Sequence, residues 1–162
     1  MTAQILIDTN VLVYTFDPRD IERQEKAITL LLQLEENAVG CLSVQCLAEF
    51  INAVVAKRRL SIGEAIQQVE RWQSVFPVLN LTSQIVLEAA RGVRDHRLAY
   101  YDAQIWAAAR LNQVQIVLSE DFQDGQAFNQ QGTAVSHDRS APFVEVQDGF
   151  ENQCIFLDRL IC

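Results

Sequence analysis

Four acidic residues occur at positions where their side chains could meet in one pocket: Asp8, Glu49, Asp102 and Asp121. Asp8 and Asp121 both follow short apolar runs that are typical of strands in a parallel sheet. Glu49 and Asp102 lie on segments whose apolar residues recur at helical spacing. Because the carboxyl ends of parallel strands meet at one edge of a sheet, the first two acids can converge there, and flanking helices can bring in the others.

Several carboxylates in one pocket repel one another unless a divalent cation balances their charge. Oxygen ligands without a nearby Cys or His suit Mg²⁺ or Mn²⁺ rather than zinc. The chemistry that uses such a cluster is metal-assisted hydrolysis of a phosphodiester, in which the ion activates water and neutralises charge on the phosphate. The four acids therefore predict a metal-dependent phosphodiesterase site.

Each acid also has a purely structural interpretation. Asp8 and Asp121 could be turn residues or helix caps, and Asp102 could complement the dipole of its helix. Glu49 projects from an apolar helix surface, where an unpaired charge is costly, so a salt bridge to an arginine is its alternative. Spacing alone leaves these alternatives open.

Composition places the chain among ordinary globular proteins, with 162 residues, 49% hydrophobic side chains and 21% charged ones. The formal net charge of -8 argues against a protein held on nucleic acid or anionic lipid by bulk positive charge. Five acidic and two basic side chains of that balance fall in residues 133–162, and the four candidate ligands account for most of the remainder. A local nucleic-acid site is therefore compatible with the overall acidity.

The first residues show neither a basic start nor a long apolar run, and no segment has the roughly 18 apolar residues that a membrane span needs. We therefore expect a cytoplasmic protein with no membrane association. Its four cysteines form no CxxC pair, and Cys41 and Cys46 are expected to fill the core as free thiols.

Strands and helices are expected to alternate along the chain, which predicts an α/β fold with a parallel sheet in three layers. Strands are expected at 4–8, 39–43, 77–81 and 114–118, and helices at 21–37, 44–58, 62–74, 83–95 and 101–112. Asp20, Ser43 and Thr82 have the residue types and positions of helix N-caps. A polar turn is expected at 119–125 and an edge strand at 143–146.

In these motifs the chain resembles the PIN-domain family, and most closely its VapC-type toxins. The resemblance is carried by Ile-Leu-Ile-Asp8-Thr9-Asn10, by Glu49 in Ser-Val-Gln-Cys-Leu-Ala-Glu-Phe, by Tyr-Asp102-Ala, and by Ser119-Glu-Asp121-Phe-Gln-Asp124-Gly. Each motif is common by itself, but their order and the elements they follow make the combination specific. The match runs from residue 5 to about residue 131.

The resemblance implies a three-layer α/β/α fold and a Mg²⁺- or Mn²⁺-dependent endoribonuclease acting as the toxin of a type II toxin–antitoxin pair. Asp8, Glu49, Asp102 and Asp121 match the family's acidic metal-binding positions, and Thr9, Asn10 and Ser119 match its polar supporting positions. Asp124 falls where some members place a further acid, although an aspartate in a glycine-containing turn is its alternative. Family members commonly form homodimers, and those that are toxins are neutralised by an antitoxin, so the resemblance implies RNA, a second copy and a VapB-type antitoxin as partners.

The last part of the chain departs from the family pattern. Members usually end soon after the Asp121 motif, whereas about thirty residues follow it here. We therefore divide the chain into a PIN-like nuclease domain, 1–131, and a C-terminal extension, 132–162.

Two other functions compete with the nuclease. A phosphatase or phosphotransferase with Asp8 as nucleophile would share the strand that ends in aspartate, but such enzymes have a second aspartate two residues later, where this chain has Asn10. A non-catalytic module that binds RNA or a protein partner would keep the carboxylates for structure.

Two basic clusters could border an RNA site: Lys57–Arg59, and the group of Arg91, Arg94 and Arg97. Solvated helix ends are the alternative for both.

Overall fold

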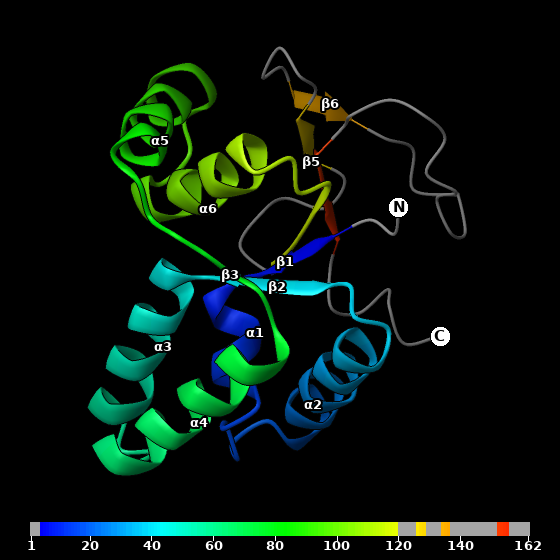
Figure 1. The fold of residues 1–162 in the computed structure, drawn as a ribbon, viewed down its shortest axis with the longest axis vertical. Helices are drawn as coiled ribbons and strands as arrows, with labels where there is room; N and C mark the ends of the chain where they lie inside the picture. The colour runs from blue at the N-terminus through cyan, green and yellow to red at the C-terminus, as the bar shows by residue number, and fades with distance from the viewer. Residues whose placement is uncertain (1–3, 120–125, 129–133, 137–151, 156–162) are drawn as a thin grey trace.

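The sheet at the centre of the molecule is mainly parallel (Figure 1). The computed structural model describes residues 4–119, 126–128, 134–136 and 152–155. Five strands run parallel in the order β3-β2-β1-β4-β7, and β5 and β6 extend the sheet antiparallel beyond β7. Their bounds are β1 Ile5–Ile7, β2 Gly40–Ser43, β3 Val78–Leu79, β4 Ile116–Leu118, β5 Gln126–Phe128, β6 Ala134–Ser136 and β7 Asn152–Ile155.

Helices cover both faces of this sheet, as the sequence predicts. Figure 1 shows α1 to α4 on one face and α5 and α6 on the other, which gives three layers. Their bounds are α1 Thr9–Tyr14, α2 Ile21–Glu36, α3 Val44–Ala56, α4 Ile62–Val75, α5 Ser83–His96 and α6 Tyr100–Leu111. Within the described ranges, none of these helices combines the length and apolar character needed to cross a membrane.

Helix starts follow the capping residues read from the sequence. The side chains of Asp20, Ser43 and Thr82 each accept a hydrogen bond from the backbone N–H three residues later, at 3.0, 3.1 and 3.3 Å. These bonds satisfy N–H groups that have no partner inside their own helix. The predicted helices are therefore confirmed, with ends that differ by one or two residues.

Helix α1 is a helix that the sequence did not predict, and strands β5, β6 and β7 were not predicted either. This helix begins directly after β1 and has only six residues, so its apolar pattern is too short to separate from that of the strand. Val11 and Leu12 of α1 are fully buried. The side chain of Asp8 caps the helix by accepting from the Thr9 N–H at 2.6 Å.

Strands β6 and β7 come from the segment expected to be an extension. β7 pairs with β4 in parallel, and Val117 faces Cys154 in that register. The division at residue 131 stays a prediction. The turn expected at 119–125 lies almost entirely outside the described residues, and the edge strand expected at 143–146 lies wholly outside them.

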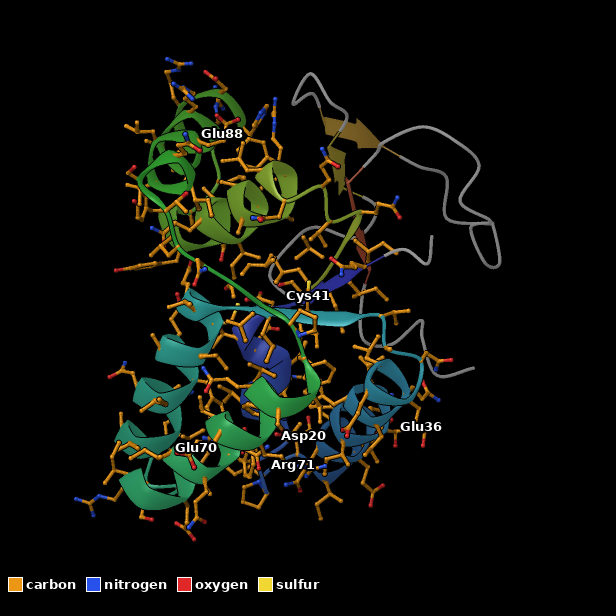
Figure 2. The ribbon with its side chains drawn as sticks, in the orientation of Figure 1. Asp20, Glu36, Cys41, Glu70, Arg71 and Glu88 are labelled. Atoms are coloured by element: carbon orange, nitrogen blue, oxygen red, sulfur yellow. The ribbon has the colours of Figure 1, made fainter. Side chains whose placement is uncertain are left out.

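Cys41 and Cys46 fill the core, as expected from the sequence. Both are fully buried, and Figure 2 shows Cys41 at the central sheet between the helical layers. Burial raises the pKa of the Cys41 thiol to about 12. Burial, together with the nearby charge of Asp8, raises the pKa of Cys46 to about 12 as well. Both thiols are therefore protonated and pack as small apolar groups.

An ion pair joins the ends of α1 and α3 that lie away from the sheet. Arg59 Nη2 lies 2.6 Å from Asp17 Oδ2, and the two side chains are only 7% and 11% exposed. Arg59 Nη1 also donates to the Val13 carbonyl at 3.5 Å. The hydrogen bond from Arg19 and the charge of Arg59 lower the pKa of Asp17 below its ordinary value.

Helices α5 and α6 approach closely at Gly92. A Cβ atom at this position would lie 2.7 Å from Cζ3 of Trp106, whose side chain is 3% exposed and cannot move aside freely. Gly63, in α4, has no atom within 4 Å of the corresponding position. Of these two glycines, packing therefore requires only Gly92.

We expect Gly92→Ala to lower the free energy of unfolding by about 1–2 kcal/mol, because the overpacking exceeds the gain in helix propensity. Gly63→Ala is the matched control and is expected to raise it by about 0.5 kcal/mol. Urea denaturation measures both changes. Equal effects of the two substitutions would contradict the proposed close contact.

We expect Asp17→Asn to destabilise the protein at neutral pH, because buried Arg59 loses its charged partner. The folded-state pKa of Asp17 lies below its unfolded value, so its contribution is complete above about pH 4 and is lost as the pH falls further. The difference in stability between native protein and variant should therefore shrink in acid.

Urea denaturation between neutral pH and about pH 2 follows this difference. Asp95→Asn is the control, because the Asp95–Arg94 pair is exposed and should contribute much less. A difference that grows on acidification would contradict the interpretation.

Candidate metal-binding pocket

A pocket of about 230 Å³ lies where α1, α3 and α6 meet. Asp8 enters it at the junction of β1 and α1, Glu49 from α3, and Asp102 from the first turn of α6. The lining residues are Asp8, Thr9, Asn10, Val13, Tyr14, Glu49, Ala53, Lys57, Asp102 and Ile105. We call this the carboxylate pocket.

Asp8 is the most deeply buried of these acids, with 3% of its surface exposed. Its Oδ1 accepts from the Thr9 N–H, and its Oδ2 accepts from the hydroxyl of Ser119. Its own N–H donates to the Leu118 carbonyl at 3.0 Å. Asp8 is thus held by β4 as well as by the start of α1, so its carboxylate has a fixed position at the end of β1.

Ser119 links Asp8 to Asn10. The serine is 1% exposed, and its hydroxyl accepts from Asn10 Nδ2 at 3.3 Å while donating to Asp8 Oδ2. Ser119 directly follows β4, and Asn10 is on the first turn of α1. This chain of hydrogen bonds fixes the orientation of the Asp8 carboxylate across the edge of the sheet.

Glu49 is held by two neutral donors. Thr9 Oγ1 donates to Glu49 Oε2 at 3.2 Å, and Gln45 Nε2 donates to Glu49 Oε1 at 2.7 Å. Sequence analysis offered a salt bridge to an arginine as the alternative role of Glu49. In the structure this half-buried carboxylate instead accepts hydrogen bonds from Thr9 and Gln45. Neutral donors orient the group without cancelling its charge, so the charge remains available to a cation.

Gln45 also connects Glu49 to the helix that carries Asp102. The same Nε2 atom donates to the Tyr101 carbonyl at 3.1 Å, immediately before Asp102 in the chain. Gln45 is 7% exposed, so both hydrogen bonds are shielded from water. A single amide group therefore sets the spacing between α3 and the start of α6.

The donor set of the pocket suits a hard divalent cation. Asp8, Glu49 and Asp102 contribute only carboxylate oxygens, and Lys57 is the single basic residue of the lining. Across the part of the chain that the structure describes, no three His, Cys, Asp or Glu side chains form a ready-made cage for an ion. The pocket thus has carboxylate ligands suited to a divalent cation, but the oxygens of the acids that the structure describes do not already converge on a single coordination site.

The structure brings together most of the residues singled out in the sequence. Three of the four main acids line the carboxylate pocket with Thr9 and Asn10, and Ser119 contacts it through Asp8. Asp121 and Asp124 lie outside the described residues.

Sequence analysis missed Gln45, and it singled out Lys57 only as part of a basic cluster, not as a residue beside Glu49. Gln45 precedes Glu49 by four residues and Lys57 follows it by eight, so both lie on the helical stripe that contains Glu49. That spacing is the signal that could have found them.

Comparison with known families gives one match that covers most of the chain: the PIN domain, over residues 5–123. Among proteins with curated descriptions, none is similar enough in sequence to count as a match.

Several solved structures share the fold. Mycobacterium tuberculosis VapC20, described as a sarcin–ricin loop cleaving toxin, superimposes with a TM-score of 0.58 at 21% identity, over 73% of this chain and 92% of that chain. FitAcB from Neisseria gonorrhoeae gives 0.53 at 23% identity, over 73% and 88%. A toxin–antitoxin complex from Klebsiella pneumoniae gives 0.54 at 20% identity, over 73% and 87%. Likenesses at these identities establish a shared fold.

We expect Gln45→Met to lower the free energy of unfolding by about 1–3 kcal/mol, because the substitution removes the buried side-chain donor to the Tyr101 carbonyl and one of the two donors to Glu49. Gln67→Met, on the exposed surface of α4, is the matched control and is expected to change stability by less than about 0.5 kcal/mol. Chemical denaturation compares the two variants. Equal stabilities would show that the Gln45 hydrogen bonds do not hold α3 to α6.

Proposed function

The chain belongs to the PIN domain family, and from that premise we propose that it is a metal-dependent endoribonuclease that hydrolyses phosphodiester bonds in RNA. The observation that carries the proposal is the convergence of Asp8, Glu49 and Asp102 on one pocket at the carboxyl edge of the sheet. Carboxylates from three separate elements meet there although their mutual repulsion opposes it. A bound cation would relieve that repulsion.

In this proposal Asp8, Glu49, Asp102 and Asp121 hold Mg²⁺ or Mn²⁺, and Asp124 is a further candidate ligand. The cation, when bound, lowers the pKa of a coordinated water and offsets charge on the phosphate. Thr9, Asn10 and Ser119 orient the carboxylates, since each makes a hydrogen bond to Asp8, to Glu49 or to another of the three. Because these donors are part of the folded framework, they keep the carboxylates oriented before any ion arrives.

We further propose that the protein is the toxin of a type II toxin–antitoxin pair, acts in the cytoplasm, forms a homodimer and is neutralised by a VapB-type antitoxin. Support comes from the fold shared with a toxin that cleaves the sarcin–ricin loop and with structures of toxin–antitoxin complexes. Co-purification with the product of a small neighbouring gene tests the antitoxin partner.

The two competing functions make different demands on the pocket. An aspartyl-phosphate mechanism needs Asp8 as a free nucleophile, whereas both of its carboxylate oxygens accept hydrogen bonds from the framework. A non-catalytic module binds no cation, so nothing in it would offset the electrostatic repulsion among the carboxylates that line one pocket. Both observations favour the nuclease.

We expect Asp8→Asn and Asp102→Asn each to lower the rate of Mg²⁺- or Mn²⁺-dependent RNA cleavage by more than about 100-fold, since each removes a ligand rather than an outer-sphere contact. The thermal midpoint should stay the same or rise, because removing one negative charge relieves repulsion within the pocket. Asn also caps helices as well as Asp does, so α1 should remain intact in Asp8→Asn.

Cleavage of labelled RNA with and without EDTA measures the rate, and calorimetry with Mn²⁺ measures ion binding independently. Asp95→Asn on the surface of α5 removes the same charge and should leave both readouts unchanged. Full activity in both pocket variants would contradict the proposal. RNA binding without any Mn²⁺ binding would instead favour the non-catalytic module.

A further inference from the structure

A second pocket, of about 460 Å³, is lined by residues that follow α1 and α3. Figure 1 shows that these ends of the two helices point away from the sheet. The lining of the pocket comes from the connection between α1 and α2, from Gln24 in α2 and from the residues that follow α3. The lining residues are Phe16, Asp17, Pro18, Arg19, Gln24, Lys57, Arg58 and Arg59. We call this the basic pocket.

The charge of the basic pocket is opposite to that of the protein. Four cationic side chains and one carboxylate line it, which gives a local excess of three positive charges in a chain whose net charge is -8. Such a local excess attracts anions despite the overall acidity. Guanidinium groups in particular match the geometry of phosphate oxygens.

One buried ion pair builds the floor of the basic pocket. Arg59 is held by Asp17 and by the Val13 carbonyl, and its side chain is 7% exposed. Asp17 also binds Arg19 at 2.9 Å through two nitrogens, so a single carboxylate orients two arginines. Lys57 and Arg58 are exposed at the rim. The basic pocket thus combines one buried, ion-paired arginine with solvent-exposed cationic side chains.

Lys57 lines both the basic pocket and the carboxylate pocket. On α3, Glu49, Ala53 and Lys57 follow one another at intervals of four residues, so they form one stripe about 12 Å long. The two pockets are therefore adjacent along α3, with the carboxylates at the sheet end and the cationic side chains at the far end. A ligand that reaches both must carry phosphate at more than one position.

We propose that the basic pocket binds a backbone phosphate of the same single-stranded RNA whose scissile phosphate occupies the carboxylate pocket. This inference rests on the proposed function, because it assigns the ligand as RNA. Lys57 and Arg58 contact the phosphate, and Arg59 supports the site from below. Since the contacts reach phosphate rather than bases, the basic pocket adds affinity without sequence preference.

Arg58 offers a substitution that separates RNA binding from folding. Its backbone has a φ of 52°, in the left-handed region that favours glycine, and Arg97 after α5 has a φ of 57°. Both arginines are exposed and follow the end of a helix, but Arg97 lies outside both pockets. Replacing either with glycine removes one positive charge and relieves backbone strain.

The experiment measures binding of a labelled single-stranded RNA of roughly 12 nucleotides by fluorescence anisotropy, in EDTA to prevent cleavage and over a range of salt concentrations. We expect Arg58→Gly to weaken binding about threefold at low salt. The slope of log Kd against log salt should fall by about 0.7, the value for one phosphate contact with a single strand. Adding Lys57→Gln to Arg58→Gly should weaken binding further, while the total fall in slope stays at about 0.7, because both side chains contact the same phosphate.

Arg97→Gly is the matched control and should leave the affinity and the slope unchanged, while both glycine variants keep or raise the thermal midpoint. Inorganic pyrophosphate added as a competitor separates the two sources of phosphate. Displacement of the RNA only at concentrations far above the Kd of the RNA supports a polynucleotide site, whereas displacement near that Kd would show a site for a small free anion and overturn the proposal.

Equal slopes for the native protein and Arg58→Gly, or an equal loss in Arg97→Gly, would overturn it as well. The binding results can be interpreted separately from the nuclease activity, because EDTA prevents cleavage during the measurement. Loss of catalysis in Asp8→Asn with unchanged binding by Arg58→Gly would refute the basic pocket alone, and the reverse pattern would refute the nuclease alone.

Discussion

The rest of the site depends on the hydrogen bonds that hold Asp8 at the end of β1. A carboxylate that is 3% exposed is stable only if donors replace its lost water, and the Thr9 N–H and the Ser119 hydroxyl do so. The first bond starts α1, and the second ties that start to the end of β4. Asp8 therefore fixes the direction of α1, whose residues form one wall of the carboxylate pocket.

The donors around the acids are neutral, and this determines the character of the pocket. Glu49 receives hydrogen bonds from Thr9 and Gln45, which orient it without forming an ion pair. Paired arginines would have stabilised the same carboxylates but left no charge for an ion. The protein instead places its buried ion pair, Asp17 with Arg59, at the far end of α1 and α3, where it supports the framework.

Sequence analysis recovered the elements whose ends are marked by capping residues, because Asp20, Ser43 and Thr82 make local hydrogen bonds that the sequence itself specifies. It missed α1, since six residues between a strand and a loop carry too little periodicity. It placed Asp8 after its strand, Asp102 near the start of its helix and Glu49 within its helix, and the structure brings all three to one pocket. The four-residue spacing to Glu49 could have indicated Gln45, but its hydrogen bond to the Tyr101 carbonyl joins residues distant in the chain, and spacing does not reveal that contact.

One face of α3 explains why an acidic protein can offer two pockets of opposite charge. Gln45, Glu49, Ala53 and Lys57 recur every fourth residue, so the stripe passes from a positioning amide to a carboxylate, a small residue and a cation. The small side chain of Ala53 leaves the stripe open between the two charges, and Val13 and Tyr14 of α1 form the opposite wall. Gln45 holds one end of this helix to α6, and Arg59 ties the residues after its other end to α1. Since both ends are held, the rise of the helix between them fixes the distance between the two charged regions.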